Sequence, residues 1–456
     1  MPRSKRSKTQ RRRTLALALL GLPLLVIPGA LAAPTVTLGP ETQVTSDGPM
    51  WEVAETADPS NPSKLAITSI VGTASSPPQS EVFVTTNGGA SWSRTYITSG
   101  RGEGDFDPTI TACPEHRGHA VYLFGYLDQS QTFHLMRSAN DGSTWSSTWN
   151  SPTTTDHPRM AVDPSDPNGA VGLYIAGKDE ASHNLRVWYL TGGCSSTPHA
   201  TELDAAASVA PLNSIVVYRD HTVGFFYQDV PVSDGAGGYY QSYSVIEGKW
   251  AGAPPNATLT LGDATSMFTL HDKVYNKNNG GQMDSQFVRA PSSDTLYATL
   301  VNWTKPKVAP WLEIVSSTDR GRTWSSPVAV DTPPSGYLAD GQSELMINAS
   351  GTIGVSFLRA VRALGQLGQF PCYSYDAFFT ASFDGGQSWS TPTKLDNAMS
   401  IPDCIKQEGG GQARWTGGDY TVGAADASGA FHPIWPDWRL GPLVPGSLYT
   451  RGATAP

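Results

Sequence analysis

Short runs that alternate apolar and polar residues, separated by turn-forming residues, fill most of this 456-residue chain. Between residues 51 and 98, four such runs follow one another: Trp51–Asp58, Lys64–Gly72, Glu81–Asn87 and Ser91–Thr98. Alternation with a period of two predicts strands with one buried face, and the residues between the runs predict turns. The segment therefore predicts a small antiparallel sheet of four strands.

An octapeptide of the form Ser/Thr-x-Asp/Asn-x-Gly-x-Ser/Thr-Trp occurs four times, and its copies begin at Thr85, Ser138, Ser317 and Ser382. The side chain of its Asp or Asn is suited to accept hydrogen bonds from turn N–H groups, and its Gly permits a positive φ. Its Trp is suited to pack between sheets. We expect each copy to form a hairpin turn, and we expect degenerate copies at residues 191–194 and 247–250 in the long middle gap.

These octapeptides resemble the Asp boxes, or BNR repeats, of sialidases and related secreted propeller proteins. The resemblance extends over nearly the whole chain after its N-terminal segment. It implies an all-β fold, a β-propeller of four-stranded blades with one octapeptide turn per complete repeat.

Seven repeat units can be counted along the chain. After the first, units begin near Asp107, His157, Leu212, Ser285, Ser343 and Tyr420. The last unit has only three clear strands, and the segment Thr35–Val44 would supply its fourth and close the ring, which removes exposed sheet edges. We therefore predict seven blades, with six as the alternative because sialidases have six.

The N-terminus has the order of a secretory signal peptide. Seven of the first thirteen residues are cations, and an apolar run from Leu15 to Ile27 and the small residues 30–33 follow. A membrane anchor is the weaker alternative, because the run is short and Pro23 and Pro28 interrupt it. We expect export by the general or the twin-arginine route, with cleavage near Ala32/Ala33 that removes residues 1–33. Residues 34–456 are then expected to form one secreted domain, extracellular or periplasmic, without a stable membrane span.

Removing this segment leaves 31 − 7 = 24 basic residues against 40 acidic ones, a formal charge of 24 − 40 = −16. A strongly acidic protein repels phosphate backbones, so nucleic acid is excluded as a partner. A glycan or glycoconjugate is the expected partner, and the chain is expected to be a monomer.

The four cysteines, Cys113, Cys194, Cys372 and Cys404, show no Cys-x-x-Cys spacing. In an exported protein they are expected to form disulfides, and three connectivities are possible. The implied propeller places Cys113 and Cys194 on one face and Cys372 and Cys404 on the other. Because a disulfide needs a Cα separation of about 6 Å, we predict the pairs Cys113–Cys194 and Cys372–Cys404.

Ionisable residues gather where the units' first strands begin and their second strands end. Near the starts of first strands these residues are Asp105, Asp107, Asp156, His157, Arg159, Asp284, Asp340, Glu344, Asp419 and Tyr420. Near the ends of second strands they are Asp229, Arg359, Arg362, Asp437 and Arg439. For any single Asp, capping its own turn is the simpler interpretation. Carboxylates packed round one axis would nevertheless repel one another unless cations lay between them.

The resemblance to sialidases implies exo-acting glycoside hydrolysis by a Tyr activated by a Glu, an Asp as acid and base, and three Arg that clamp a carboxylate. Transferred to this chain, it assigns these roles to Tyr420 with Glu344, to Asp107 or Asp156, and to Arg159, Arg359 (or Arg362) and Arg439, with Asp419 and Asp437 as further substrate-binding residues. The Arg-Ile-Pro motif of sialidases is absent, since residues 50–55 contain no Arg.

The alternative is a propeller that binds carbohydrate or protein without catalysis, through aromatic residues such as Trp303, Trp415, Trp435 and Trp438. No metal or cofactor is expected, because neither His157 nor His432 has a second ligand nearby in sequence at metal-binding spacing.

Overall fold

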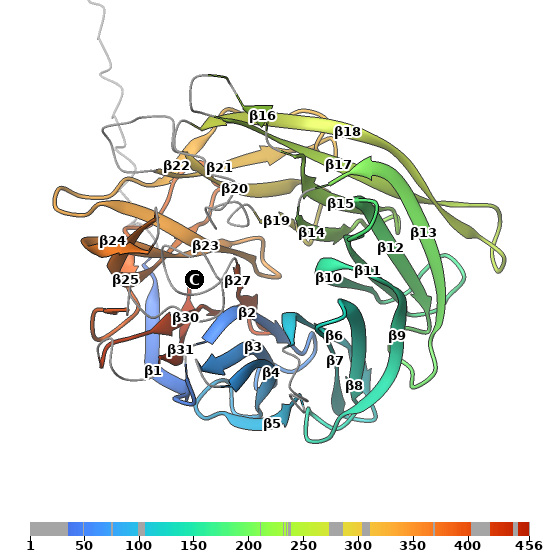
Figure 1. Cartoon of the computed structure of the whole chain (residues 1–456), viewed down its shortest axis with the longest axis horizontal. Helices are drawn as coiled ribbons and strands as arrows, with labels where there is room; N and C mark the ends of the chain where they lie inside the picture. The colour runs from blue at the N-terminus through green and yellow to red at the C-terminus, as the bar shows by residue number, and fades with distance from the viewer. Residues whose placement is uncertain are drawn as a thin grey trace, which may run out of the picture. The chain divides into compact units, whose positions relative to one another are not determined.

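The structure is a computed structural model that describes residues 35–455 apart from 49, 74–75, 99–104, 210, 231, 234, 236–238, 273–285, 303–310, 368–369, 403–419 and 441–445. The predicted signal peptide lies outside these residues. Pro34–Pro456 forms one compact unit. Throughout the described part the regular elements are β-strands, and they form seven sheets arranged round a centre (Figure 1).

The first three blades each contain four antiparallel strands. Blade 1 contains β2 (Met50–Ala57), β3 (Leu65–Thr73), β4 (Ser76–Thr85) and β5 (Ser93–Ile97); blade 2 contains β6 (Phe106–His116), β7 (His119–Leu127), β8 (Thr132–Ser138) and β9 (Ser146–Thr154); blade 3 contains β10 (Asp156–Asp163), β11 (Gly172–Lys178), β12 (Asn184–Thr191) and β13 (His199–Ser208).

The other four blades follow the same order, with extra short strands in blades 4 and 7. Blade 4 contains β14 (Leu212–Val217), β15 (Val223–Gln228), β16 (Val232–Ser233), β17 (Tyr239–Ala251) and β18 (Thr258–Asp272); blade 5 contains β19 (Phe287–Arg289), β20 (Leu296–Asn302), β21 (Trp311–Ser317) and β22 (Val328–Asp331); blade 6 contains β23 (Ala339–Ile347), β24 (Ile353–Leu367), β25 (Phe370–Ser382) and β26 (Thr393–Lys394); blade 7 contains β28 (Ala424–Ala425), β29 (Phe431–His432), β30 (Ile434–Asp437), β31 (Ser447–Thr454) and β1 (Thr37–Thr45). The remaining strand, β27 (Thr421–Val422), pairs in parallel with β2.

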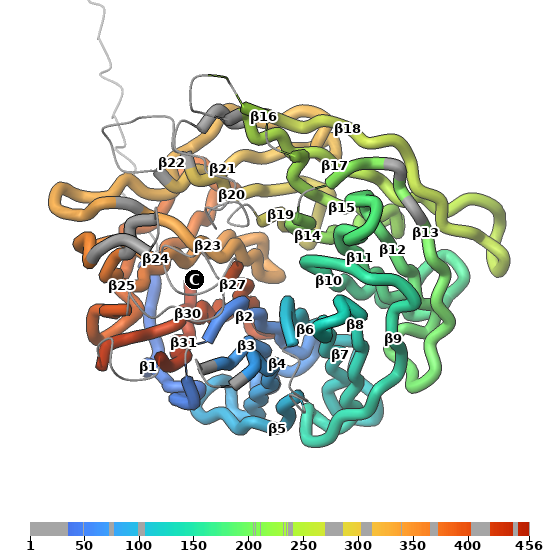
Figure 2. Tube along the Cα trace, in the orientation of Figure 1, coloured from blue at the N-terminus to red at the C-terminus, as the bar shows by residue number. Residues whose placement is uncertain are grey.

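The ring closes between the two ends of the described chain. β1 pairs antiparallel with β31, with Thr42 opposite Thr450 (Figures 1 and 2). This pairing supplies the strand that the last unit lacks, so the prediction of seven blades closed by the N-terminal strand is confirmed. The six-bladed alternative is wrong.

The hydrophobic core is divided into seven clusters, and each lies between two neighbouring blades. Between blades 2 and 3, for example, Phe133 and Leu135 pack in one cluster with Trp188 and Leu190. Alternation along each strand therefore buries side chains on both faces of every sheet, against the blade before and the blade after.

The octapeptides form the turns between the third and fourth strands of their blades. In the copy that begins at Ser317, Asp319 Oδ1 accepts a bond from Thr323 N (2.8 Å), and Ser317 Oγ accepts one from Gly321 N (2.8 Å). Gly321 has a φ of +88°. Equivalent bonds occur in the other three copies. The Trp of this copy, Trp324, packs edge-on against Phe268 of blade 4, with 5.4 Å between the ring centroids.

One of the two expected degenerate turns is wrong. Residues 247–250 lie inside the continuous strand β17. The glycine at position 248 serves close packing and not a turn, because a Cβ atom there would lie 2.7 Å from Val223 Cγ1 in the neighbouring strand β15. The other degenerate copy does turn, at Gly192, whose φ is +63°.

A disulfide joins Cys113 at β6 to Cys194 after β12, with 6.0 Å between the Cα atoms. The first predicted pair is thus confirmed, and it ties blade 2 to blade 3. The second pair, Cys372–Cys404, stays a prediction, because Cys404 and the side chain of Cys372 lie outside the described residues. The part of the chain that the structure describes holds no helix of the length and apolarity that a membrane crossing requires.

Candidate functional site: the central pocket

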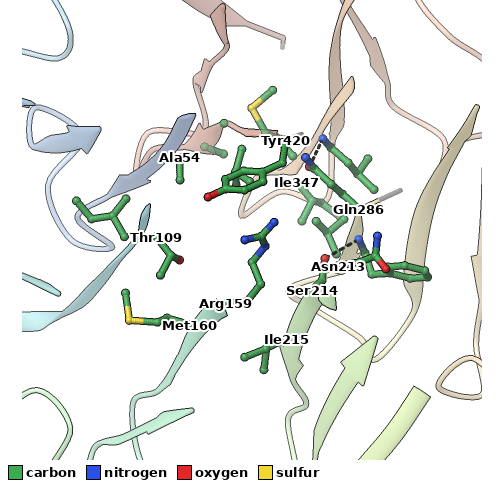
Figure 3. A pocket seen from close by; sticks show the side chains of 18 of the residues that line it. Ala54, Thr109, Arg159, Met160, Asn213, Ser214, Ile215, Gln286, Ile347 and Tyr420 are labelled. Atoms are coloured by element: carbon green, nitrogen blue, oxygen red, sulfur yellow. Dashed lines mark hydrogen bonds between the residues drawn. The ribbon is translucent and has the colours of Figure 1, made fainter. Parts of the chain in front are cut away.

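A pocket of about 290 Å³ lies at the centre of the ring and is lined by residues in or next to the first strands of the blades (Figure 3). Much of its wall is apolar, as is usual for ligand pockets. The polar side chains on the wall are those of Thr109, Arg159, Asn213, Ser214, Gln286 and Tyr420.

Arg159 is a buried cation that faces this pocket (Figure 3). Its side chain is 8% exposed, and Nη1 donates to the carbonyl of Pro158 (3.0 Å). The guanidinium carbon lies 3.9 Å from the centroid of the Tyr420 ring. Its Nε has no hydrogen-bond partner among the described residues, and no ion pair joins its guanidinium to a described carboxylate. Its charge is partly offset by Asp107, whose pKa it lowers, but no described carboxylate is hydrogen-bonded to its guanidinium, so its N–H groups have unused capacity for an anion.

Tyr420 and Glu344 were expected to act as a nucleophile and its base, but each has other partners. Tyr420 Oη donates to the carbonyl of Pro108 (2.9 Å), and burial raises the pKa of Tyr420 well above its usual value. Glu344 accepts hydrogen bonds from Ser356 Oγ and from Ile434 N (3.3 Å). Burial raises the pKa of Glu344 to about 8. Glu344 lies behind the pocket wall at Gly423, where a Cβ would be 3.0 Å from Glu344 Oε2.

Asp107 and Asp156, the other predicted catalytic residues, come together at His157. One oxygen of each carboxylate and one ring nitrogen of His157 all lie within 4.8 Å of one another. Asp107 Oδ1 is 3.3 Å from His157 Nδ1, and Asp156 Oδ1 is 3.8 Å from Nε2. Lys178 Nζ lies 2.6 Å from the other oxygen of Asp156.

The charges of this cluster are largely balanced. Burial alone would raise the pKa of Asp107, but the neighbouring charges of His157 and Arg159 hold it well below its usual range. Two carboxylates and an imidazole are a possible ligand set for a cation. Lys178 and Arg159 already supply positive charge here, so the cluster has little need of a metal.

The other two arginines of the predicted clamp belong to ion pairs and do not line the pocket. Arg359 Nε donates to Asp340 (2.9 Å), its Nη2 contacts Asp331, and its guanidinium lies 4.2 Å from the Phe378 ring. The side chain of Arg359 is 4% exposed, and its two ion pairs join blade 6 to the last strand of blade 5.

Arg439 lies in the closing blade with the predicted residue Asp437. It donates to both oxygens of Glu41 in β1 (2.7 and 2.9 Å) and to Asp437 (2.7 Å), and it lies 3.8 Å above the ring of Tyr449. Asp419 lies outside the described residues. Of the three clamp arginines, the structure therefore brings only Arg159 to the pocket.

The aromatic residues of the binding alternative are not ligand-facing where the structure describes them. Trp435 is 1% exposed and lies in the core between blades 6 and 7, and Trp438 packs against the same cluster. Trp303 and Trp415 lie outside the described residues.

Sequence reasoning missed Glu52, Lys178 and the role of His157 as the centre of the cluster. A sequence signal exists for two of the positions, because Asp107-Pro108 and His157-Pro158 stand at the same place in successive units. Glu52 has no such signal, and Lys178 comes to Asp156 only through the pairing of β10 with β11.

No model of a known protein family and no curated protein matches this chain. Among solved structures, it is similar to a protein of unknown function from Dyadobacter fermentans, with a TM-score of 0.47, 9% identity and coverage of 92% of this chain and 99% of that one. It is also similar to a Hadza microbial sialidase (TM-score 0.42, 15% identity, 69% and 65% coverage). A GH93 α-L-arabinofuranosidase of Fusarium graminearum matches with a TM-score of 0.44, 10% identity and 71% and 93% coverage. At these values the similarities say nothing about what this chain binds.

Proposed function

We propose that this chain is an exported glycan-recognition protein whose central pocket receives an acidic sugar. The observation that carries the proposal is Arg159, a buried guanidinium that faces the pocket and is not hydrogen-bonded to any carboxylate among the described residues. A planar guanidinium binds a carboxylate through two parallel hydrogen bonds. A ligand carboxylate would therefore supply the interaction that the protein itself does not provide.

The rest of the pocket suits a sugar ring. Thr109, Asn213 and Ser214 offer hydroxyl and amide groups to sugar hydroxyls, and Met160 and Ile215 offer apolar surface to its C–H groups. The volume of about 290 Å³ is at the small end for ligand pockets, which favours one sugar ring over a chain. The disulfide between Cys113 and Cys194 fits export to an oxidising compartment.

A second function, hydrolysis of the same glycan by a pair of carboxylates, is favoured by one further observation. Asp107 and Asp156 have carboxylate oxygens within 4.8 Å of each other. Retaining glycosidases hold their two carboxyl groups about 5–5.5 Å apart. Under this proposal the two Asp carboxylates with His157 perform the chemistry, and Tyr420, whose hydroxyl is bonded to a carbonyl, holds Arg159.

The test is binding and turnover by the protein of residues 34–456. Affinity is measured by calorimetry for glycans that end in sialic or uronic acid and for their neutral counterparts, and turnover is measured with the matching fluorogenic glycosides. We expect Arg159→Gln to weaken acidic-glycan binding at least about 30-fold, because losing one partner of a buried charge pair costs about 2–5 kcal/mol. Arg322→Gln, at a half-exposed arginine in the octapeptide turn of blade 5 that is paired with Glu247, is the control and should bind normally.

Hydrolysis and simple binding give different results in this test. If the protein is a hydrolase, Asp107→Asn and Asp156→Asn should abolish turnover while binding persists. If wild type binds the acidic glycans without turning any over, the non-catalytic function holds. Equal affinity for acidic and neutral glycans, or full affinity in Arg159→Gln, would show that the pocket does not receive a carboxylate.

A further inference from the structure

Four non-glycine residues with left-handed backbone stand at the same place in four blades. Glu52, Asp107, His157 and Gln342 have φ values of +52°, +47°, +48° and +48°. Each lies where the pairing of the blade's first strand with its second shifts register. Such a conformation costs an L-residue about 1–2 kcal/mol, and it persists only where the surroundings enforce it. We call these four the bulge residues.

In three neighbouring blades the bulge residues are connected. At a bulge the strand ladder is locally interrupted, so a backbone N–H there needs another acceptor. The N–H of Asp107 donates to Glu52 Oε2 (3.2 Å), and the N–H of His157 donates to Asp107 Oδ2 (3.3 Å). The side chains of Glu52 and Asp107 thus each accept a hydrogen bond from the backbone N–H of the bulge residue in the next blade, which connects blade 1 to blade 2 and blade 2 to blade 3.

This series of bonds ends beside the pocket. Arg159 follows His157 by two residues in β10, and Asp107 lies close enough for the charge of Arg159 to lower its pKa. The Asp107 carboxylate therefore has three neighbours that fix it: the backbone and ring of His157 and the field of Arg159. Any movement of Asp107 would be passed to the strand that carries Arg159.

We propose that Glu52 is a positioning residue, which sets Arg159 in place for the acidic sugar by holding the Asp107 and His157 bulges. This inference rests on the proposed function of the pocket. Glu52 is not among the residues that line the pocket, so it acts on Arg159 through its neighbours: it interacts with the Asp107 side chain, bonds to the Asp107 backbone, and its charge acts on Tyr420.

Gln342 is the matched control. It has the same left-handed backbone, but it lies in blade 6, and its Nε2 donates to Thr421 Oγ1 (3.1 Å). Replacing it leaves the bonds between blades 1, 2 and 3 in place, but Thr421 adjoins the pocket residue Tyr420, so Gln342→Ala is a control for hydrogen exchange and not for affinity.

The first measurement needs no ligand. Hydrogen exchange at the amides of Asp107 and His157 is compared in wild type, Glu52→Ala, Glu52→Gln and Gln342→Ala. We expect Glu52→Ala to speed exchange at both amides. Glu52→Gln should preserve protection, because its Oε1 still accepts the bond, and Gln342→Ala should leave both amides unchanged. Faster exchange at residue 107 alone would show that no movement is passed to blade 3.

The second measurement is the affinity for the acidic glycan. We expect Glu52→Ala to bind about tenfold more weakly, because Arg159 is then no longer held in its binding position, and Glu52→Gln to bind like wild type. If Glu52→Gln bound the acidic glycan as weakly as Glu52→Ala does, the negative charge of Glu52 would be what matters, and the hydrogen bond that it accepts would not. Glu52→Asp, which is too short to reach, replaces Glu52→Ala if the latter does not fold.

The two proposals fail in different ways. If wild type binds no acidic glycan, the proposed function fails, while hydrogen exchange still decides whether Glu52 holds the two bulges. If wild type binds and Glu52→Ala binds equally well, the positioning role is wrong and the pocket's function stands.

Discussion

Glu55 and Glu344 are two carboxyl groups buried beside the pocket wall, 4% and 1% exposed. Burial raises the pKa of Glu55 well above its usual value, and the nearby Glu344 raises it further. Burial also raises the pKa of Glu344 to about 8. Glu344 is therefore largely protonated in the folded protein at neutral pH, whereas in the unfolded chain it is ionised above about pH 4.5.

This difference predicts that stability falls as the pH rises. Between about pH 4.5 and 8 the folded state keeps a proton on Glu344 that the unfolded state has lost, so unfolding becomes easier by up to about 1.4 kcal/mol per pH unit for that proton. Glu344→Gln should remove this part of the slope and be more stable than wild type at pH 8, with little difference below pH 4.5. The measurement is the urea midpoint as a function of pH.

Glu115→Gln, at a partly exposed ion pair, is the control and should keep the wild-type slope. A slope unchanged in Glu344→Gln would mean that Glu344 is ionised in the fold.

The octapeptide turns join hydrogen bonding and packing in one element. Gly142, in the second copy, has a φ of +78°, and a Cβ there would lie 2.3 Å from Val84 Cγ1 of blade 1. Glycine is thus needed twice at this position, once for the backbone and once for the close approach of the neighbouring blade.

Gly118 separates these two needs. It also has a left-handed φ, +81°, but a Cβ there would meet nothing within 4 Å. We expect Gly118→Ala to cost about 1 kcal/mol of backbone strain, and Gly142→Ala about 1–3 kcal/mol more from overpacking. Urea unfolding of the two variants measures the difference. Equal losses of unfolding free energy in the two variants would show that the neighbouring blade accommodates the added methyl group without destabilisation.

Closure of the ring depends on the short strand β1. Besides pairing with β31, β1 carries Glu41, which forms ion pairs with Arg439. Without β1 the outer edge of β31 would be exposed, and an unpaired edge is a template for association with another chain.

We expect deletion of residues 35–45 to lower the thermal midpoint and to cause concentration-dependent association. A synthetic peptide of residues 35–45 should restore the midpoint. Glu41→Gln, which keeps the strand and weakens only the ion pair, should lose much less stability. Calorimetry and light scattering test this, and a deletion variant that stays monomeric with an unchanged midpoint would show that β1 does not close the ring.

The features predicted well are those that rest on local patterns. The octapeptide from Ser317 to Trp324 forms its turn with the expected bonds, because the acceptor, the glycine and the donors lie within a few residues of one another. The exception, residues 247–250, contains a glycine whose purpose is close packing against Val223, which no local pattern reveals.

The site was predicted less completely. Asp107, Asp156, Arg159 and Tyr420 do gather at the centre of the ring, because the first three lie in first strands of their blades and Tyr420 directly precedes β27, which pairs with β2. Residues at the ends of second strands need not reach the centre: Arg359 is paired with Asp340 and Asp331, and Arg439 with Glu41 and Asp437.

The sequence by itself determined most of the strands, the octapeptide turns and the seven repeats, because alternation, turn chemistry and repetition act over short stretches of chain. Only the tertiary structure decided which charged side chains form ion pairs with one another and which face the pocket without such a pair. Arg439 meets Glu41 across 398 residues, while Arg159 meets no described carboxylate as an ion pair. Ion pairs form between side chains that lie close together in the closed ring, and this closeness does not depend on their separation along the chain.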